Sequence, residues 1–290
     1  MKYSYFPGCT LPTQMKNFEL TVRWTARRLG IELEELDSWQ CCQAVFPLST
    51  DSPMGLVASF RALINAHQAG RALVTCCSGC FHVIKRTAHL MARDQETRQK
   101  LEAFCEQEYP PEGVQVLHYL DLLLSSLESV QPPVPLKDLR VGAYYGCLLL
   151  RPEDELGFDD PEDPQKMERL VRLLGAEPVL YAYRTECCGS YSSLLDRAGA
   201  EAAVRAIVSS ARRAGAQVLV TSCPLCFWNL EESSLALATR EPSFAPLPVL
   251  YFTQLVALAL AAPDECLDWS AHRIDPRPAV AAFLPEVKEA

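Results

Sequence analysis

The 290-residue sequence predicts an α/β fold made of two tandem, duplicated α/β domains with mainly parallel sheets. Three observations carry this prediction: a cysteine pattern that occurs twice, further sequence matches around it, and strands that alternate with helices. Each copy has one cysteine, then an adjacent pair, then a C-x-x-C motif. In both copies 34 residues separate the pair from the C-x-x-C motif, whereas the first gap is 31 residues in one copy and 39 in the other. The ten cysteines are Cys9, Cys41, Cys42, Cys77 and Cys80 in the first copy, and Cys147, Cys187, Cys188, Cys223 and Cys226 in the second.

The sequence around these cysteines repeats as well. The matching segments are residues 5–9 with 144–147, residues 73–81 with 219–227, and residues 116–119 with 249–252. These matches occur in the same order in both halves, so we predict that the chain is a duplication of one α/β unit. The repeat also places Cys76 opposite Ser222 and Cys77 opposite Cys223. We therefore predict that Cys77, and not Cys76, belongs to the first cysteine group.

Hydrophobic spacing and Gly or Pro punctuation predict the elements of each half. The first half has a strand at 2–6, a helix at 15–29, a strand at 31–36, a helix at 56–69, a strand at 72–75, one long helix to about Cys105, a strand at 114–117 and a helix at 119–127. The second half has a strand at 141–145, helix near 166–174, strand at 179–182, helix at 195–214 and strand at 217–221, then helix, strand and helix. We predict a first domain at 1–127, a Pro-rich linker at 128–140, and a second domain with a C-terminal tail at 141–290.

This order of elements predicts where the cysteines lie. Parallel sheets place their binding crevices beyond the carboxyl ends of the strands, and three of the four segments that carry cysteines follow a predicted strand. Cys80 falls in the first turn of the next helix, where backbone N–H groups favour a thiolate. We expect Gly8, Gly79 and Gly189 to let the backbone come close to bulky inorganic sulfide.

Composition excludes several classes of function. A net charge of −9 argues against a nucleic-acid partner, and no apolar run is long enough for direct membrane insertion. The first residues have no apolar stretch typical of an export signal, so we expect a cytoplasmic protein. In that setting thirteen cysteines indicate metal or redox chemistry rather than disulfide bonds.

Five thiolates at one site favour a multi-iron cluster over zinc, which prefers four ligands. A four-thiolate zinc site stays the alternative, at one site or both. His82, two residues after Cys80, is a weak candidate for a proton donor, and we identify no other catalytic residue beyond the cysteines. Arg151 and Arg184 could hold an anionic substrate, or could be ordinary solvated charges. Outside the repeat, Cys105 and Cys266 are expected to be small buried apolar residues.

The cysteine pattern and the opening residues 5–12 (YFPGCTLP) resemble the B subunit of heterodisulfide reductase, which has two cysteine-rich CCG domains. The resemblance extends from about residue 2 to residue 252. It implies that each group of five cysteines binds a non-cubane [4Fe-4S] cluster, and that a disulfide or thiol substrate reacts between the two clusters. It also implies two partners in one complex: a small ferredoxin-like subunit that carries cubane clusters, and a larger flavin-containing subunit.

One residue departs from the family pattern. Gln43 follows the first cysteine pair where the motif has glycine, whereas Gly189 follows the second pair. The family also leaves the substrate open, because CCG domains resemble subunits of glycolate, lactate and succinate-linked enzymes as well. Two alternatives to a disulfide reductase therefore remain: an electron-transfer subunit with a non-disulfide substrate, and a zinc-binding scaffold protein.

Overall fold

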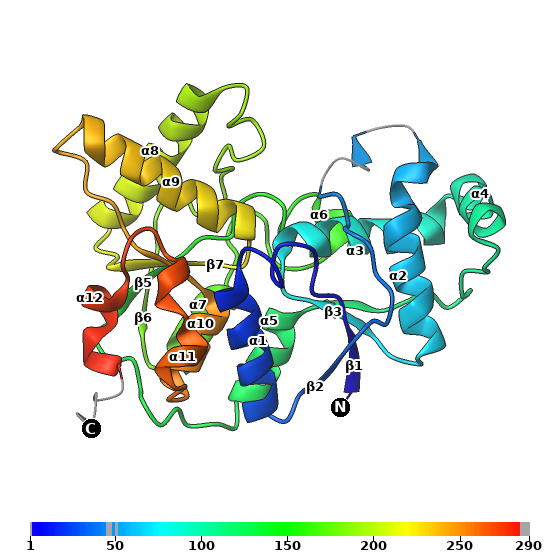
Figure 1. Ribbon diagram of the computed structural model, residues 1–290, viewed down its shortest axis with the longest axis horizontal. Coiled ribbons are helices and arrows are strands. Elements are labelled where there is room, and N and C mark those ends of the chain that lie inside the picture. The colour runs from blue at the N-terminus through cyan, green and yellow to red at the C-terminus, as the bar shows by residue number, and fades with distance from the viewer. Residues whose placement is uncertain (1, 45–47, 50–51, 285–290) are drawn as a thin grey trace.

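A computed structural model of the chain describes residues 2–44, 48–49 and 52–284, and contains two four-stranded sheets in which every strand pair is parallel (Figure 1). The first sheet has the order β2-β1-β3-β4 and the second the order β6-β5-β7-β8. The strands are β1 (Lys2–Tyr5), β2 (Glu32–Glu35), β3 (Leu73–Thr75), β4 (Val116–His118), β5 (Arg140–Ala143), β6 (Glu177–Val179), β7 (Val218–Thr221) and β8 (Val249–Tyr251). The predicted α/β class and the duplication of a parallel unit are confirmed.

Helices connect the strands of each half, as parallel pairing requires. The first half contains α1 (Lys16–Arg28), α2 (Val57–Gln68), α3 (Ser78–Arg93), α4 (Gln95–Cys105) and α5 (Tyr119–Leu127), with a 3₁₀ turn η2 (Pro53–Leu56). The second half contains α6 (Glu153–Leu156), α7 (Lys166–Leu173), α8 (Arg197–Arg213), α9 (Pro224–Arg240), α10 (Phe252–Ala259), α11 (Asp264–Leu267) and α12 (Arg277–Val280), with 3₁₀ turns η3 (Trp269–Ala271) and η4 (Ala281–Phe283). The division at 128–140 stays a prediction.

Two details of the sequence prediction are wrong. The single long helix expected up to Cys105 is two helices, because Asp94 leaves the helical conformation and caps α4 by accepting a hydrogen bond from the Thr97 N–H at 3.0 Å. The strand expected at 179–182 lies at Glu177–Val179 instead, where it pairs with β5. A helix cap in the first case, and strand pairing in the second, override the element predicted from hydrophobic spacing.

The two halves meet through buried side chains. Helix α1 of the first half packs against α10 of the second, and the two lie side by side in Figure 1. Across this contact the ring of Phe18 stacks on that of Tyr251 at 4.0 Å, and the hydroxyls of Thr21 and Thr253 are 2.7 Å apart. All four side chains are buried, so the interface is continuous with the hydrophobic core of both halves.

A second contact joins the loops that carry the cysteines. The hydroxyls of Ser78 and Ser222 lie 2.6 Å apart, and the backbone N–H of Ser78 donates to the carbonyl of Ser222. Ser78 follows Cys77 and Ser222 precedes Cys223 in the sequence. The segments that follow β3 and β7 are therefore in direct contact, and they bring the two cysteine groups to the same interface.

Candidate metal centres

The cysteines of each group lie beyond the carboxyl ends of parallel strands. Cys9 follows β1, the Cys41-Cys42 pair follows β2, and Cys77 is the N-cap residue of α3 directly after β3. Cys80 lies in the first turn of α3. The second half repeats this arrangement around β5, β6, β7 and α9. The placement agrees with the prediction from the order of elements.

The five sulfur atoms of the first group form a continuous series of contacts. The sulfur atoms of Cys9 and Cys41 are 3.2 Å apart, and those of Cys42 and Cys80 are 3.4 Å apart. Cys41 also interacts with its neighbour Cys42, and Cys80 with Cys77. The series therefore runs from Cys9 through the adjacent pair to the C-x-x-C motif.

The second group forms the same series in the same order. Cys147 interacts with Cys187, and Cys187 with its neighbour Cys188. The sulfur atoms of Cys188 and Cys226 are 3.6 Å apart, and Cys226 is joined to Cys223. Cysteines with up to 39 residues between them are thus brought together, and the order of their contacts is the same in both halves.

All thirteen cysteines are free thiols, and three stand outside the two series. The buried Cys76 has its sulfur 3.5 Å from the hydroxyl of Tyr5, away from the sulfur contacts of its neighbour Cys77. Cys105 and Cys266 are half-buried and pack against the hydrophobic core, so they are less buried than expected. Within the part of the chain that the structure describes, no three cysteine, histidine or carboxylate side chains are arranged to hold a single metal ion.

The contacts between thiols favour a thiolate in each group. The interaction with Cys41, and then that with Cys80, lowers the pKa of the Cys42 thiol to about 4. In the second group a hydrogen bond from Cys147 is the largest cause that lowers the pKa of Cys187 to about 2. Since the thiolate is the form that binds metal, each group contains sulfur in the chemical state of a ligand.

Comparison with known families identifies the domain that is repeated in this chain. The family described as the CCG cysteine-rich domain matches residues 3–85 and 141–231, which together make up more than half of the chain. The chain belongs to the CCG family. It carries two copies of the domain, one for each cysteine group, as the resemblance in the sequence implied.

Two curated relatives of this CCG protein cover nearly its whole length. It is 31% identical over 278 residues to the 8-methylmenaquinol:fumarate reductase membrane anchor subunit of Wolinella succinogenes, covering 94% of this chain and 97% of that protein. It is 28% identical to the B subunit of the Ferredoxin/F(420)H(2)-dependent CoB-CoM heterodisulfide reductase of Methanosarcina acetivorans, covering 91% of each chain. Both relatives are named as subunits of reductases. Among the described residues of this chain, no helix combines the length and apolar character needed to cross a membrane.

A solved structure has a similar fold. The crystal structure of a hypothetical protein from Helicobacter pylori superimposes with a TM-score of 0.74 over 93% of this chain. The two sequences are only 11% identical, and the CCG protein spans about half (51%) of the other chain. This similarity therefore supports the fold and carries no information on function.

Glycines allow the backbone to pass close to the cysteine sulfurs. Gly8 has a φ of +75°, and a Cβ placed there would lie 2.7 Å from the sulfur of Cys80. Gly146, its equivalent in the second CCG domain, has a φ of +65° and would place a Cβ 3.3 Å from the sulfur of Cys226. Gly146 is absent from the glycines predicted from sequence, although the repeat aligns the glycine before Cys147 with the glycine before Cys9.

The other two predicted glycines have different surroundings. A Cβ on Gly189 would meet the backbone of Ala200 in α8 at 2.9 Å, so this glycine serves the packing of a helix rather than an approach to sulfur. A Cβ on Gly79 would make only an ordinary contact with the sulfur of Cys77, at 3.8 Å. Of the three predicted glycines, only Gly8 lies so close to a sulfur atom that a side chain would not fit.

Gln43 keeps the backbone conformation of the glycine that it replaces. Its φ is +60°, and the φ of Gly189 at the matching position is +78°. In both CCG domains the N–H of this residue donates to the sulfur of the first cysteine of the pair, at 3.3 Å in each case. The departure from the motif therefore leaves the hydrogen bond to this cysteine unchanged and adds a side chain beside the first site.

His82 is buried at the contact between the two halves. Its Nδ1 donates to the carbonyl oxygen of Leu148 at 3.0 Å, and its Nε2 accepts from the Arg86 guanidinium at 3.2 Å. Burial lowers the pKa of the imidazole, which favours this neutral form. Its hydrogen-bond partners are thus a backbone carbonyl and an arginine, and they connect α3 to the residue that follows Cys147. A proton-donating role for His82 stays a prediction.

The two arginine candidates differ in exposure, because Arg184 is buried whereas the Arg151 side chain is 38% exposed. Arg184 is buried and pairs with Glu168 and Asp163, while Arg151 donates to the carbonyl of Thr185 at 3.0 Å. The carbonyl oxygen of Arg184 accepts hydrogen bonds from the N–H groups of residues 145 and 146, just before Cys147. The carbonyl oxygen of Arg184 therefore supports the backbone just before Cys147. The charge of its guanidinium is already compensated by Glu168 and Asp163.

Replacing Arg184 by alanine is expected to lower the free energy of unfolding by about 3–5 kcal/mol, because Glu168 is left as an unpaired buried charge. Denaturant unfolding of the purified protein measures this. Arg169→Ala is the control, since its ion pair with Glu128 is exposed on both sides and should cost less than about 1 kcal/mol. Equal costs for the two variants would show that Glu168 is not stabilised by Arg184.

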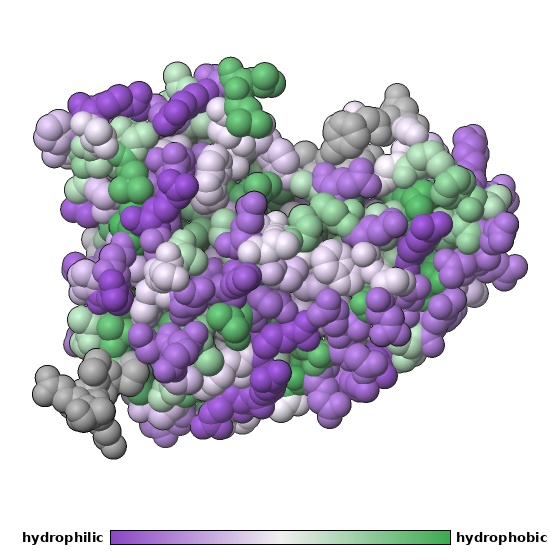
Figure 2. All heavy atoms as spheres, viewed as in Figure 1, coloured by the Kyte–Doolittle hydropathy of each residue, from purple (hydrophilic) through white to green (hydrophobic). Residues whose placement is uncertain are grey.

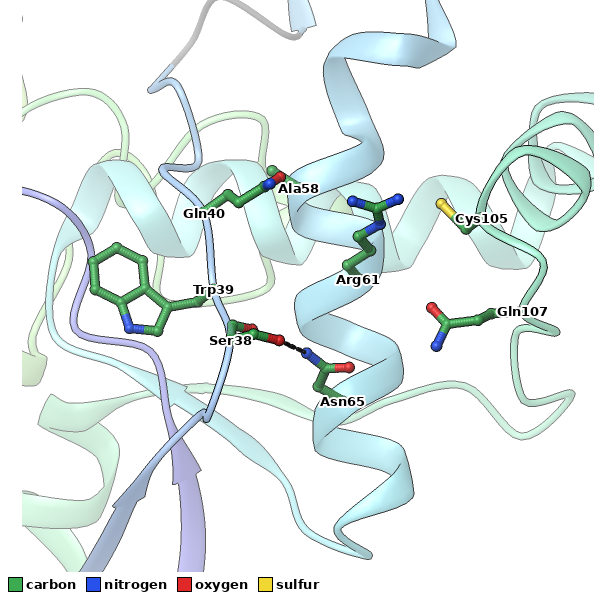
Figure 3. A pocket seen from close by; sticks show the side chains of 8 residues that line it. All are labelled: Ser38, Trp39, Gln40, Ala58, Arg61, Asn65, Cys105 and Gln107. Atoms are coloured by element: carbon green, nitrogen blue, oxygen red, sulfur yellow. Dashed lines mark hydrogen bonds between the residues drawn. The ribbon is translucent and has the colours of Figure 1, made fainter.

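A cavity of about 510 Å³ lies beside the segment that leads to the first cysteine pair. Figure 3 shows the side chains that line it, from the segment before Cys41, from α2 and from the end of α4, with Arg61 and Cys105 pointing toward the hollow. The side-chain amide of Asn65 donates a hydrogen bond to the carbonyl oxygen of Ser38 at 3.0 Å and fixes one end of the cavity. None of the ten repeated cysteines is among the described residues that line it, so the cavity is separate from the sulfur series.

Proposed function

We propose that each cysteine group binds one non-cubane [4Fe-4S] cluster, and that the protein is the iron–sulfur subunit of a reductase complex that reduces a disulfide. The observation that carries this proposal is that five sulfur atoms form the same series of contacts in each of the two CCG domains. Five thiols per site exceed what a tetrahedral zinc ion uses, and adjacent cysteines can bind different irons of one cluster. The curated relative named as the B subunit of a heterodisulfide reductase supports the disulfide as substrate.

The residues present fit a large anionic group. Cys80 and Cys226 lie in the first turns of α3 and α9, where the helix dipole stabilises negative charge. Gly8 and Gly146 keep their side chains out of the space next to these sulfurs. When bound, the two clusters would supply one electron each to the substrate. The chain itself contributes the ligands, the backbone N–H donors at residues 43 and 189, and a rigid distance between the sites.

The interface between the halves is the proposed place of reaction. The Ser78–Ser222 contact joins the residues next to Cys77 and Cys223, so the two sites share one boundary. Figure 2 shows a notch in the molecular surface between the two halves, which would give a small substrate a route toward this boundary. Buried aromatic side chains at the interface exclude water from the space behind it.

A second function is favoured by a specific observation. The relative that is 31% identical is named as part of a quinol:fumarate reductase, and this name mentions no disulfide. The same cysteine sites could therefore pass electrons to or from a substrate that is not a disulfide. Assays of the intact complex with a disulfide and with fumarate as alternative electron acceptors separate these functions, since turnover with only one of them assigns the substrate class.

Exposed apolar residues support membership in a complex. Leu194 and Leu195 are 94% and 95% exposed, and Tyr191 and Leu225 are exposed nearby in sequence to Cys188 and Cys226. Figure 2 shows hydrophobic side chains at the outer edge of the second half, where this loop lies. Such groups are typical of surfaces that a partner protein covers. We propose that the partners are a ferredoxin-like protein and a flavin-containing protein of the same complex, and that the location is cytoplasmic, as expected for a protein rich in free thiols.

The test of the proposed function is the metal and acid-labile sulfide content of protein purified without oxygen, with its visible absorption spectrum. We expect about eight irons per chain and matching sulfide, as two four-iron clusters require. About four irons with one zinc would restrict the proposal to one site. Zinc alone in a colourless protein would overturn it in favour of a zinc-binding scaffold.

A further inference from the structure

Two adjacent cysteines precede α3, and only the second belongs to the sulfur series. Cys76 is completely buried, with its sulfur 3.5 Å from the hydroxyl of Tyr5. That hydroxyl already donates to Glu19 at 2.7 Å, so the Cys76 thiol is the donor in this contact. Cys77 has an extended backbone, and neighbouring side chains in an extended segment point to opposite sides. The backbone at Cys76 and Cys77 therefore determines which of the two thiols faces the first site.

A buried histidine holds this backbone. His118 is the last residue of β4 and is completely buried, and its Nε2 lies 3.0 Å from the carbonyl oxygen of Cys76. Its Nδ1 lies 3.2 Å from the backbone nitrogen of Leu120, whose N–H can only donate, so the one proton of the neutral imidazole is on Nε2. Burial lowers the pKa of the imidazole to about 3, which keeps it neutral. The Nε2–H therefore donates to the Cys76 carbonyl.

The imidazole of His118 is held in one orientation by three aromatic rings. Phe81, which directly follows Cys80, meets it edge-on with ring centres 5.5 Å apart. Phe158 and Phe252 of the second half lie at 5.3 Å and 5.7 Å. All three phenylalanines are buried. These contacts fix the direction of the Nε2–H bond toward the Cys76 carbonyl.

The second half holds the equivalent carbonyl with a different donor. The repeat places Ser222 opposite Cys76, and the carbonyl oxygen of Ser222 accepts a hydrogen bond from the Ser78 N–H at 3.2 Å. Tyr251 is the equivalent of His118, and its hydroxyl has no hydrogen-bond partner in the described chain. The carbonyl just before the C-x-x-C motif is thus held in both CCG domains by unrelated donors. This recurrence indicates that each site needs the carbonyl in a fixed orientation.

We propose that His118 positions the first metal site: its Nε2–H fixes the Cys76 carbonyl and so directs the thiol of Cys77, rather than that of Cys76, toward the sulfur series. This inference rests on the proposed function, in which the first cysteine group holds a cluster. The carbonyl of Cys76 and the nitrogen of Cys77 belong to one planar peptide, so fixing the first orients the second. His118 acts through a backbone carbonyl and is therefore a positioning residue rather than a ligand.

The test compares His118→Phe, which keeps an aromatic ring but has no N–H, with His118→Gln, whose side-chain amide carries N–H groups. Each protein is purified without oxygen, and the release of iron to the chelator ferrozine is followed over time. We expect the first site of His118→Phe to release iron about tenfold faster than that of the wild type, because the buried carbonyl loses its donor. His118→Gln should restore most of the wild-type rate. Release from the second site, identified as the phase missing in Cys188→Ala, should be unchanged.

Tyr251→Phe is the matched control, because it removes a hydroxyl at the equivalent position of the second half, where the carbonyl has another donor. It should leave both release rates unchanged. Equal rates in the wild type and His118→Phe would overturn the inference and leave the proposed function intact. Faster release from His118→Gln than from His118→Phe would also overturn it, since filled space rather than the N–H would then matter. If His118→Phe binds no iron at the first site, full iron there in His118→Gln supports the inference, and its absence from both variants overturns it. A wild type without iron would overturn the proposed function as well.

Discussion

Replacing Cys188 or Cys223 by alanine is expected to remove the second cluster and reduce the iron content from about eight to about four atoms per chain. Both side chains are almost completely buried, and both lie in the sulfur series of the second CCG domain. Either substitution removes one of the five sulfur atoms of that series. The first site has its own sheet and its own cysteines, so its cluster should remain. Metal analysis and electron paramagnetic resonance of the reduced protein measure both outcomes.

Cys266→Ala is the control for these variants. Cys266 lies outside the repeat and is half-buried near the end of the chain, so its removal should leave iron and sulfide unchanged. Circular dichroism should show that all three variants keep their secondary structure, because each substitution removes a single sulfur atom. Full iron content in Cys188→Ala and in Cys223→Ala would contradict the assignment of these residues as ligands.

The fold and the arrangement of both cysteine groups could be predicted because the same sequence pattern occurs twice in the chain. Matching segments fix which residues are equivalent, and strands that alternate with helices leave parallel sheets as the consistent solution. Parallel sheets in turn gather whatever follows their strands at one edge. That is why Cys9, Cys42 and Cys77, which are far apart in sequence, can be assigned to one site from the order of elements alone.

Other features depend on contacts that no local pattern encodes. The break at Asp94 is a capping hydrogen bond to the Thr97 N–H, and an N-cap aspartate inside a helical pattern is the only sequence signal of it. Arg184 is a candidate by its closeness in sequence to Cys187, but its partners come from α7 and from the acidic loop before it. The sequence shows which side chains are charged, whereas tertiary packing decides which charges are compensated.

Tyr251 illustrates the same limit at the interface. As an aromatic residue at the end of a buried strand, it is indistinguishable in sequence from an ordinary core residue. The repeat places it opposite His118, whose ring nitrogens both have partners: the N–H of Leu120 at 3.2 Å and the carbonyl of Cys76 at 3.0 Å. The two halves therefore have equivalent backbones with different polar groups at this position. The stacking of Phe18 on its ring shows that Tyr251 belongs to the contact between the two halves, which the sequence alone does not reveal.

Replacing Gly8 by alanine is expected to destroy the first site, with a loss of about four irons per chain. Two effects act together at this position. The φ of +75° strains any residue with a side chain by about 1–2 kcal/mol. In addition, the new Cβ would lie 2.7 Å from the sulfur of Cys80, which is buried and joined to both Cys42 and Cys77. Cys80 can move away only by breaking the sulfur series. Iron analysis and denaturant unfolding of the variant measure the two effects separately.

Gly30→Ala separates backbone strain from contact with sulfur. Gly30 follows α1 with a φ of +68°, close to that of Gly8, but a Cβ there would have no atom within 4 Å. This control should therefore cost about 1 kcal/mol in the free energy of unfolding and leave the iron content unchanged. Gly146→Ala should fall between the two, because its Cβ would be 3.3 Å from the Cys226 sulfur and a small shift could relieve the contact. If Gly8→Ala kept all its iron and matched Gly30→Ala in stability, the sulfur of Cys80 would not be fixed in place, and the close approach of backbone to sulfur would have no role in forming the site.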